Sequence, residues 1–359
     1  MKVLLVGDYS SFHRYLKEGL QELGVNVTLA SAGDGWKKIG GADIILPSAK
    51  GNFYQQFKTL YLDPFKIVKD LKDYDVVQFI NPLAFSVFVS NPIFNILKKQ
   101  NNIVSYAACG TDYAFWESWK KGRFEYSPFD FDKISRDYYD YKNCRGFVRT
   151  FVEKSITPNF DIIIPMLYEY KIGYKNHPNA YHVIPQPINT KNIIYRNNIV
   201  KDKIFFFHGI NREDFKGTPF IREAMTRLQN KYPSDVEILL DGHMPFDKYM
   251  DIITKANVVI DQCCGYGYGI NACISMAQGR VVMAPAREET LQEFGINNCP
   301  IIHVKPDVDY IYNQMAGILE RKNKITEIGY ESRLYVESMH NYIEVAKQYI
   351  DAWKSTGKI

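Results

Sequence analysis

The sequence predicts an α/β protein made of two domains, each with a parallel sheet covered by helices. Short apolar runs of strand length alternate with amphipathic segments of helical length along the chain, a pattern typical of buried parallel strands flanked by helices. An Asn-rich and charge-rich stretch at residues 188–203 interrupts the alternation. With 359 residues, the chain is also longer than one hydrophobic core usually organises. We therefore expect two domains.

The first series of strands and helices lies in the N-terminal half. We expect strands at KVLLVG (2–7), VNVTLAS (25–31), VVQFI (76–80), IVSYAA (103–108), DIIIP (161–165) and YHVIP (181–185). The segment after the first strand places Phe12, Leu16 and Leu20 near one face of a helix, and Gly24 supplies its C-terminal stop. This half predicts a complete βαβ domain, residues 1–190.

The second series follows the interruption. We expect strands at KIFFFHG (203–209), VEILL (236–240), VVIDQ (258–262), RVVMA (280–284) and IIHV (301–304). Helices are expected at 219–230, with Pro near the first turn, and at 247–256, 270–278 and 331–354. These patterns predict a second domain at 191–335 and a C-terminal helix at 336–359 that returns to the N-terminal domain.

Composition excludes several classes of protein. The net charge of +4 is too mild for a nucleic-acid-binding protein, which needs clustered basic residues. The six cysteines show no zinc-type spacing and are interpreted as reduced thiols of a cytoplasmic protein. The N-terminus is too short in apolar residues for a signal peptide, and no run approaches the roughly 20 apolar residues that span a bilayer. We expect a cytoplasmic protein, soluble or peripheral on the inner face of the membrane.

The loop after the first strand indicates a ligand site. Its sequence, GDYSSF (7–12), does not match G-x-G-x-x-G, which disfavours a nicotinamide or flavin cofactor. Gly7 would still let a ligand approach the backbone at a helix N-terminus. His13 either faces a cleft from the first helical turn or is an ordinary surface residue.

A second candidate site is HGINREDFKGT (208–218), between a predicted strand and a predicted helix. Arg212 and Lys216 lie four residues apart on a loop that Gly209 makes flexible. Arg offers a bidentate fork and Lys a point charge for phosphate oxygens. The loop is therefore interpreted as a phosphate site, the alternative being a solvated surface loop.

Two further loops carry candidate residues. In GYGYGINACISMAQG (265–279), the turn from Gly267 through Tyr268 and Gly269 to Ile270 precedes a helix whose free N–H groups suit a phosphate or sugar hydroxyls. Its tyrosines could stack on a base or a sugar, or the turn could serve close packing alone. In CGTDY (109–113), Asp112 is either a cleft carboxylate or a helix N-cap.

Taken together, these segments resemble the group 1 glycosyltransferases, family 4 of the sugar-nucleotide enzymes. The resemblance includes KVLLVG with a His-bearing first helix, the connector HVIPQPINTKNI (182–193), the Arg212/Lys216 loop, and ANVVIDQ (256–262) followed by the Gly-rich turn and ISMAQGRVVMA (274–284). It implies a GT-B fold, in which two Rossmann-like domains face each other across a cleft. The sequence is most similar to the branch that builds bacterial surface polysaccharides.

The resemblance also implies a mechanism. A sugar would pass from a nucleotide-sugar donor to a glycan or lipid-linked acceptor with retention of configuration, and the departing phosphate oxygen would accept the acceptor's proton. Arg212 and Lys216 would stabilise the leaving group, while His13 and Asp112 would face the acceptor. Gly7, Gly209 and the turn at 267–270 would contact the donor, and no metal or other cofactor would be needed.

The sequence departs from the family at the paired glutamates, which would fall at Tyr266 and Ile274. Because the second glutamate normally grips the donor ribose, we expect Glu288 or Glu289, rather than Asp261, to replace it. The missing pair also supports an alternative, a non-catalytic sugar- or nucleotide-binding homologue that assists a partner enzyme. Two aromatic-basic segments, FNILKK (94–99) and FWESWKKGRF (115–124), either contact a membrane surface or form a buried aromatic cluster with solvated lysines.

Overall fold

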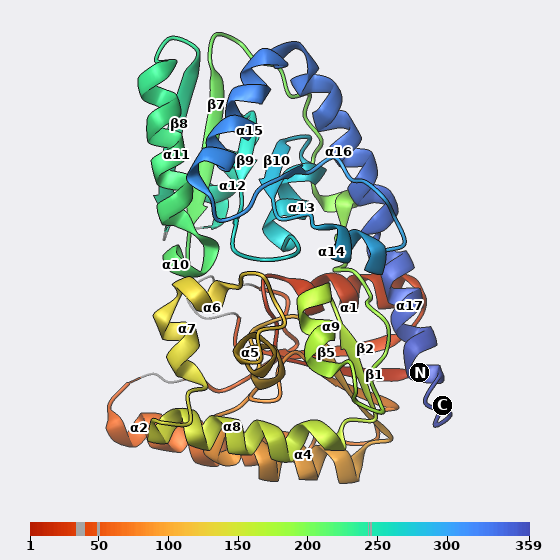
Figure 1. The fold of residues 1–359 in the computed structure, drawn as a ribbon. Coiled ribbons are helices and arrows are strands. Elements are labelled where there is room, and N and C mark those ends of the chain that lie inside the picture. Colours follow the sequence, from red (N-terminus) through yellow and green to blue (C-terminus); the bar gives the residue numbers. More distant parts are fainter. Residues whose placement is uncertain (34–39, 49–50, 243, 245) are drawn as a thin grey trace. The chain divides into compact units, whose positions relative to one another are not determined.

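The computed structural model describes residues 1–33, 40–48, 51–242, 244 and 246–359. The chain forms two compact α/β units, each with a parallel sheet and flanking helices (Figure 1), as predicted. Unit 1 contains Met1–Arg123, Arg136–Pro187 and Tyr342–Ile359, and unit 2 contains Phe124–Ser135 and Ile188–Asn341. The chain therefore divides after residues 187 and 341. The sequence did not predict that 124–135 belongs to unit 2.

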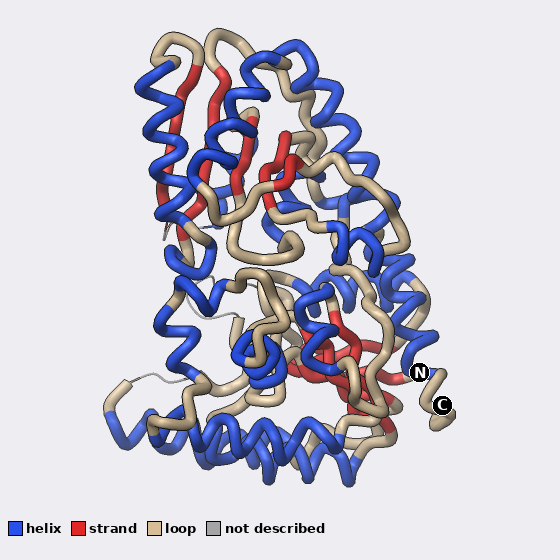
Figure 2. Tube along the Cα trace, in the orientation of Figure 1, coloured by secondary structure: helices blue, strands red, loops and turns tan. Residues whose placement is uncertain are grey.

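The sheet of unit 1 has the strand order β3-β2-β1-β4-β5-β6, with every described pairing parallel. Its strands, drawn in red in the lower part of Figure 2, are β1 (Lys2–Val6), β2 (Asn26–Ser31), β3 (Ile44–Ile45), β4 (Val76–Phe79), β5 (Ile103–Ala108) and β6 (Ile162–Pro165). The β4, β5 and β6 residues are all buried, so their apolar runs reflect helices on both faces.

Helices of unit 1 cover this sheet. They are α1 (Phe12–Glu22), α2 (Phe53–Phe57), the π-helix η2 (Lys58–Leu62), α3 (Asp63–Val68), α4 (Val87–Gln100), α5 (Tyr113–Lys120), α8 (Cys144–Ile156), α9 (Tyr168–Tyr174) and α17 (Tyr342–Lys354). The short helix α7 (Lys133–Tyr138) spans the division between the units. Helix α17 packs closely on α1, where Gly19 lies against the backbone of Tyr342. Residues 342–359, the end of the segment predicted at 336–359, thus belong to unit 1.

The sheet of unit 2 has the order β11-β10-β9-β7-β8, again with parallel pairs. Its strands are β7 (Ile204–Ile210), β8 (Val236–Gly242), β9 (Val258–Ile260), β10 (Val281–Ala284) and β11 (Ile302–His303). The helices are α6 (Pro128–Phe131), α10 (Glu213–Lys216), α11 (Thr218–Lys231), α12 (Phe246–Lys255), α13 (Ile270–Ala277), α14 (Glu288–Glu293), α15 (Val308–Glu320) and α16 (Ile325–Met339). Unit 2 also has the short 3-10 helices η4 (Thr190–Asn192) and η5 (Lys322–Lys324), while η3 (Thr157–Asn159) lies in unit 1.

One predicted strand is wrong. Residues 181–185 run beside β6 and make two backbone hydrogen bonds to it, from Tyr181 N to Ile163 O and from Ile184 N to Pro165 O. They do not form a regular ladder. Pro185 and Pro187 have no N–H to donate, so the pairing cannot continue.

Candidate functional site

The strand order of unit 2 defines where a ligand would bind. From β7 the chain passes through α11 to β8 on one side, and later through α12 to β9 on the other side of β7. In open parallel sheets, ligands bind beyond the carboxyl ends of strands at such a crossover, because the two connections diverge there and leave a crevice. The loops that follow β7 and β9 are therefore the first place to look for chemistry.

A buried ion pair joins those two loops. Lys216, after β7, places its Nζ 2.8 Å from Oδ1 of Asp261, which follows β9 directly. Both side chains are almost fully buried, and the same Nζ also reaches the Gly209 carbonyl oxygen at 3.5 Å. Removing two charges from water is costly even when they pair. Stabilisation of the fold therefore does not explain why this ion pair is buried, and we look for a role in ligand binding.

The local backbone explains how Lys216 reaches this position. Helix α10 ends at Gly217, whose positive φ of 75° reverses the chain before α11 begins. A Cβ on Gly217 would collide with the sulfur atoms of Cys263 and Cys264, just beyond Asp261. Glycine is thus required at this turn for two reasons, and the close approach brings Lys216 against the end of β9.

His208 holds the strands of the crossover together. Its Nδ1 lies 2.8 Å from the Ile260 carbonyl oxygen, and its Nε2 lies 2.8 Å from the Thr218 hydroxyl. Since a carbonyl can only accept, Nδ1 carries the proton and Nε2 accepts from Thr218. Burial, together with the nearby charge of Lys216, lowers the pKa of His208 to about 4. A neutral imidazole therefore ties β7, β9 and the start of α11 together.

The predicted Gly-rich turn lies beside the ion pair. Gly269 is the N-cap of α13, with no side-chain cap, and a Cβ on it would lie 3.8 Å from Oδ2 of Asp261. The first N–H groups of α13, starting at Ile270, follow this turn, and the Gly267 carbonyl oxygen accepts from Gln262. The structure thus brings Lys216, Asp261 and an uncapped helix N-terminus together at one crossover.

Tyr268 does not fit its predicted role. Its ring is fully buried, and its hydroxyl lies 2.5 Å from the Tyr335 hydroxyl and 3.0 Å from Nε2 of His340. A ring enclosed in this way cannot stack on a base or a sugar. The prediction was wrong because the residues that cover Tyr268 come from the end of α16, far along the sequence.

Arg212 is held at the edge of the same region by the segment 124–135. Its Nη2 donates to the Ser135 hydroxyl at 2.7 Å and lies 3.7 Å from Oδ2 of Asp132. Its guanidinium also stacks 3.5 Å from the centre of the Phe215 ring. The side chain is about half exposed, so Arg212 is oriented by its own unit while one side of it stays open to solvent.

Glu288 and Glu289 line a separate cavity of about 620 Å³ at the carboxyl ends of β10 and β11. Both lie in the first turn of α14. Glu289 binds Arg287 at 3.2 Å, and Glu288 accepts from Gln292 at 2.8 Å. Arg287 also binds Glu125 at 2.7 Å and lies over the Tyr266 ring. The cavity is polar and charged. Asp261, the third candidate for the carboxylate that binds the ribose, forms an ion pair with Lys216 instead.

In unit 1 the strand order reverses between β1 and β4, and Gly7 lies at this crossover. Its φ is +80°, and a Cβ would lie 2.5 Å from Cγ2 of Ile80. The backbone at the end of β1 therefore packs tightly on the end of β4. Gly7 occupies the predicted edge of the sheet, where close approach to the backbone requires glycine.

His13 is neither a cleft residue nor a surface residue. It is fully buried, with Nδ1 2.6 Å from the Gly7 carbonyl oxygen and Nε2 3.3 Å from Nε2 of Gln78. Gln78 accepts from Ser105 and Trp353 through Oε1, so its amide group donates to His13. Burial lowers the pKa of His13 to about 4. The imidazole is a neutral link in a buried chain of hydrogen bonds that also anchors α17.

Asp112 is the N-cap of α5, the second of the two readings that the sequence left open. Its Oδ1 accepts from Phe115 N at 2.8 Å, and its Oδ2 accepts from the Tyr106 and Tyr174 hydroxyls at 2.7 and 2.6 Å. The side chain is fully buried. Both carboxylate oxygens are thus hydrogen-bonded within unit 1. The prediction that Asp112 faces an acceptor was therefore wrong.

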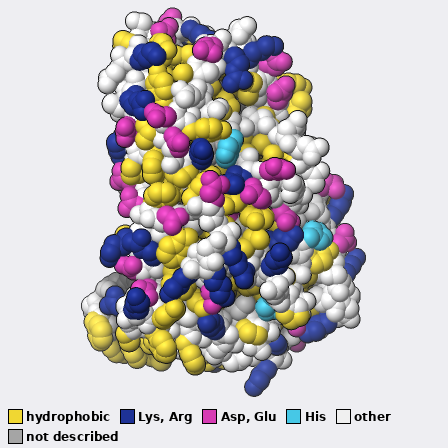
Figure 3. Space-filling view, in the orientation of Figure 1, with side chains coloured by type: hydrophobic (Ala, Val, Ile, Leu, Met, Phe, Trp, Pro, Cys, Tyr) yellow, Lys and Arg dark blue, Asp and Glu magenta, His cyan; other side chains and the backbone are white. Residues whose placement is uncertain are grey.

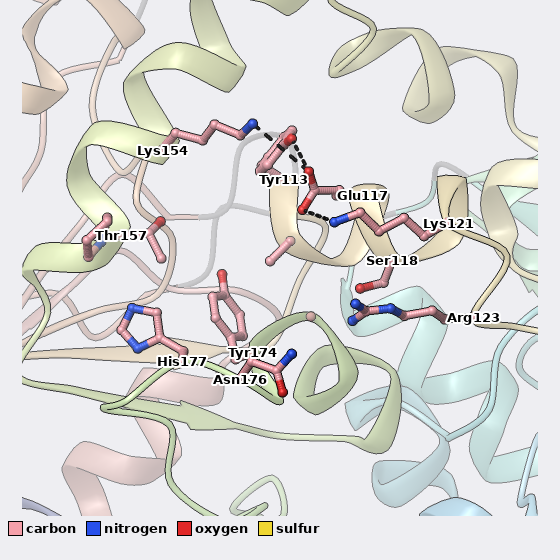
Figure 4. A pocket seen from close by; sticks show the side chains of 13 residues that line it. Tyr113, Glu117, Ser118, Lys121, Arg123, Lys154, Thr157, Tyr174, Asn176 and His177 are labelled. Carbon is pink, nitrogen blue, oxygen red and sulfur yellow. Dashed lines mark hydrogen bonds and ion pairs between the residues drawn. The ribbon is translucent and has the colours of Figure 1, made fainter.

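A second cavity, of about 330 Å³, lies between α5, α8 and α9 (Figure 4). Glu117 points into it and pairs with Tyr113, Lys121 and Lys154. Burial raises the pKa of Glu117, but the hydrogen bonds from Tyr113 and Lys121 outweigh it, so the pKa is lowered. The lining comes from α5 and from the C-terminal ends of α8 and α9.

No protein-family model and no curated protein matches the sequence. The structure, however, shares the GT-B fold of known glycosyltransferases. Sucrose-phosphate synthase from Thermosynechococcus elongatus superposes over 99% of this chain and 98% of its own with a TM-score of 0.66 and 16% identity. HepE from Anabaena, in complex with UDP and glucose, covers 99% and 100% with a TM-score of 0.64 and 12% identity. WaaG, a glycosyltransferase involved in lipopolysaccharide biosynthesis, covers 98% and 99% with a TM-score of 0.61 and 9% identity.

Sequence reasoning missed two contributors to the site. The pairing of Asp261 with Lys216 was not predicted. Both residues follow strands of the same sheet, and their position at its carboxyl edge could have indicated the pairing. Sequence reasoning also gave residues 124–135 to the N-terminal domain, whereas Asp132 and Ser135 orient Arg212 within unit 2. Among the described residues, no group of three or more His, Cys, Asp or Glu side chains is arranged to hold a metal ion.

Proposed function

We propose that the protein is a glycosyltransferase that moves a sugar from a nucleotide-sugar donor to a hydroxyl of a glycan or lipid-linked acceptor. The observation that carries the proposal is the buried Lys216–Asp261 pair beside the uncapped N-terminus of α13. A diphosphate placed there would meet a cation, a helix dipole and free backbone N–H groups at once. The GT-B fold supports the same interpretation.

In the proposed reaction, Asp261 holds the ammonium group of Lys216 in place before the donor binds. The donor's diphosphate then offers Lys216 a second anionic partner, and negative charge grows on it as the glycosidic bond breaks. Preorganised donors of this kind are worth roughly 3 kcal/mol each in the transition state. Arg212, oriented by Ser135 and Asp132, supplies a second cation to the same leaving group.

We propose retention of configuration at the transferred sugar. The acceptor oxygen forms its bond to the sugar on the face from which the nucleoside diphosphate departs, and the departing phosphate oxygen takes the acceptor's proton. This route asks for no protein carboxylate as a base, which agrees with the enclosure of Asp112. It also routes no step through a metal or another cofactor, because Lys216 and Arg212 provide the positive charge.

For the donor, we propose a uridine diphosphate sugar as the first to test, since the similar structure of HepE contains UDP and glucose. We propose that Glu288 or Glu289 holds the donor's ribose in the cavity that both line, which is supported by the position of this cavity at the carboxyl ends of β10 and β11. For the pathway, we propose the cytoplasmic assembly of a surface polysaccharide. WaaG, of similar fold, acts in lipopolysaccharide biosynthesis.

The proposal is tested by incubating the protein with a panel of nucleotide sugars and following release of nucleoside diphosphate. Release that depends on the wild-type chain and is lost in Lys216→Met supports a transferase. If the protein binds a nucleotide by calorimetry but releases none with any sugar or acceptor, it is instead a non-catalytic binding protein. One observation favours that alternative: Tyr266 and Ile274, at the family's two glutamate positions, are both buried.

A further inference from the structure

The aromatic-basic segments FNILKK and FWESWKKGRF contribute rings to the interior of the chain. Phe94, Phe115 and Trp116 are buried, and the Trp116 indole donates to the Arg136 carbonyl oxygen at 2.9 Å. Of the two roles that the sequence left open, these rings take that of a buried aromatic cluster. None of the described helices is both long and apolar enough to cross a membrane.

Residues 124–135 belong to unit 2, although the chain before and after them belongs to unit 1. We call these residues the strap. Near its start, the Glu125 carboxylate pairs with Arg287 at 2.7 Å. Near its end, the Phe131 ring contacts Phe220 of α11 with ring centres 5.1 Å apart, and α6 packs on α10 (Figure 1). The strap is therefore fixed to unit 2 at both ends.

The strap places a carboxylate beside Arg212. Oδ2 of Asp132 lies 3.7 Å from Nη2 of Arg212. The Ser135 hydroxyl joins the two groups, since it accepts from Nη2 at 2.7 Å and donates to Oδ2 at 2.5 Å. Oδ1 of Asp132 accepts from Ile134 N at 3.0 Å and from Ser135 N at 3.3 Å. These bonds hold the Asp132 carboxylate in a fixed position next to the guanidinium.

The structural role of Asp132 needs an acceptor oxygen but no charge. Asn and Ser accept from the first N–H groups of a helix about as well as Asp does. An ion pair with a half-exposed Arg212 also adds little to stability, about 0–1 kcal/mol. Figure 3 shows acidic and basic side chains next to one another on the face drawn. The negative charge of Asp132 is therefore the property that the fold leaves unexplained.

A carboxylate and a phosphate bind a guanidinium in the same way. Each offers anionic oxygens that match the N–H fork of Arg. Asp132 thus engages the Nη2 group that a phosphate oxygen of the donor would need. Its charge also opposes the charge of a diphosphate on Arg212, because the two anions would lie well within the Debye length of about 10 Å. Arg212 is about half exposed, so an incoming anion can reach it.

We propose that Asp132 competes with the donor's diphosphate for Arg212 and thereby sets the affinity of the donor site. Before the donor binds, Asp132 and Ser135 hold the guanidinium. On binding, diphosphate oxygens replace Asp132 as partners of Nη2. After sugar transfer, the carboxylate recovers Nη2 and promotes release of the nucleoside diphosphate. This inference rests on the proposed function, because it requires that Arg212 bind the diphosphate.

The test is calorimetric titration of uridine diphosphate into the full-length wild type and Asp132→Asn. Asparagine keeps the acceptor oxygen and removes the charge. We expect the Kd to fall about three- to fivefold, since an exposed ion pair is weak, and the difference to shrink as salt rises. In an assay of sugar transfer, the KM for the nucleotide sugar should fall while kcat does not rise, because ground state and transition state gain equally.

Two comparisons show whether Asp132 acts through Arg212. Asp309→Asn removes the same charge from a similar pair of unit 2, in which Arg227 is about half exposed, and should leave the Kd unchanged. In an Arg212→Gln background, Asp132→Asn should have no further effect on the Kd. Asp132→Ser, which also keeps an acceptor oxygen, should behave as Asp132→Asn does. Circular dichroism confirms that each variant is folded.

Unchanged or weaker binding of uridine diphosphate to Asp132→Asn and Asp132→Ser would overturn the inference, and so would an equal gain in the Arg212→Gln background. If the wild type still transfers sugar, the proposed function stands without it. Tighter binding to Asp132→Asn in a protein that transfers no sugar would instead refute the transferase and support the competition at Arg212. A wild-type protein that does not bind uridine diphosphate would overturn both.

Discussion

The two units place different chemistry at equivalent points of similar sheets. In unit 1 the crossover between β1 and β4 packs Gly7 against Ile80 and buries Asp8, whose carboxylate accepts from His13 N. In unit 2 the crossover between β7 and β9 holds Lys216 and Asp261. Each unit also buries a neutral histidine nearby, His13 or His208. The comparison shows that the topology creates an equivalent crossover in both sheets. The crossover of unit 2 adds a buried cation, Lys216, that can bind an anion.

The largest expected effect follows from removing the charge of Lys216. Lys216→Met should lower turnover about 10²-fold or more. It should also destabilise the protein by about 3–5 kcal/mol, because Asp261 is left as an unpaired buried charge. Enzyme assay and urea unfolding measure the two effects. Lys324→Met, which breaks an exposed ion pair of unit 2 with Glu327, is the control and should change neither.

The double variant Lys216→Met/Asp261→Leu separates the two roles of the pair. Replacing both charges by apolar side chains should restore most of the stability, while turnover stays about 10²-fold low because the phosphate has lost its cation. Recovery of turnover together with stability would show that the pair is purely structural.

The next effect concerns Arg212. Arg212→Ala should lower turnover about 10²-fold through loss of a charge-assisted bond to the leaving group. The free energy of unfolding should stay nearly constant, since the side chain is about half exposed. Arg212→Lys keeps the charge without the bidentate fork and should recover part of the activity. Normal turnover in Arg212→Ala would remove Arg212 from the donor site.

A pH series compares the buried histidines of the two units. Each has a folded pKa of about 4, below its ordinary value near 6.5, so the unfolded chain takes up protons first as the pH falls. The stability that each neutral histidine contributes is complete above about pH 6.5 and is lost progressively toward pH 4. Between about pH 7 and pH 5 the loss should be on the order of 2 kcal/mol per histidine.

Variants are needed to isolate the contribution of each histidine to the pH dependence of the free energy of unfolding. Burial raises the pKa of Glu153 to about 8, and this group contributes stability that is lost as the pH rises, the opposite direction. His13→Gln and His208→Gln cannot protonate, so urea unfolding of each should show a smaller loss between pH 7 and pH 5 than wild type. An identical loss in wild type and variants would contradict the assignment of buried neutral rings.

The smallest effect tests the close packing at the crossover of unit 1. Gly7→Ala introduces both a strained φ and a contact with Ile80, whereas Gly24→Ala introduces strain at a φ of +74° with open space around it. The extra cost in Gly7→Ala should therefore be about 1–3 kcal/mol, measured by urea unfolding. Equal destabilisation by the two variants would show that the backbone at Gly7 is not tightly packed.

The sequence predicted the parts of the fold that depend on local pattern. Strands β1 and β7 and helices α1 and α11 follow from their own apolar spacing, and the ligand edge of each sheet follows from their order. The sequence could not show what covers a side chain from a distance. His13 is enclosed with Gln78 and Trp353, and Tyr268 with Tyr335 and His340, through contacts that only the folded chain creates.

The same reason explains the errors at the site. Asp112 fits both a cleft carboxylate and an N-cap by sequence, and the choice depends on Tyr106 and Tyr174, which enclose it from β5 and α9. Lys216 and Asp261 were each seen after a strand, but their pairing depends on the crossover that places β9 beside β7.

The most direct test of the central claim is calorimetric titration of uridine diphosphate into three proteins: the wild type, Lys216→Met/Asp261→Leu, and Gly7→Ala. The first variant removes the charge at the crossover of unit 2, and the second alters the crossover of unit 1. If unit 2 holds the diphosphate, affinity should fall about tenfold or more in the first variant and stay at the wild-type value in the second. Unchanged affinity in the Lys216→Met/Asp261→Leu variant, or a loss confined to Gly7→Ala, would contradict the claim.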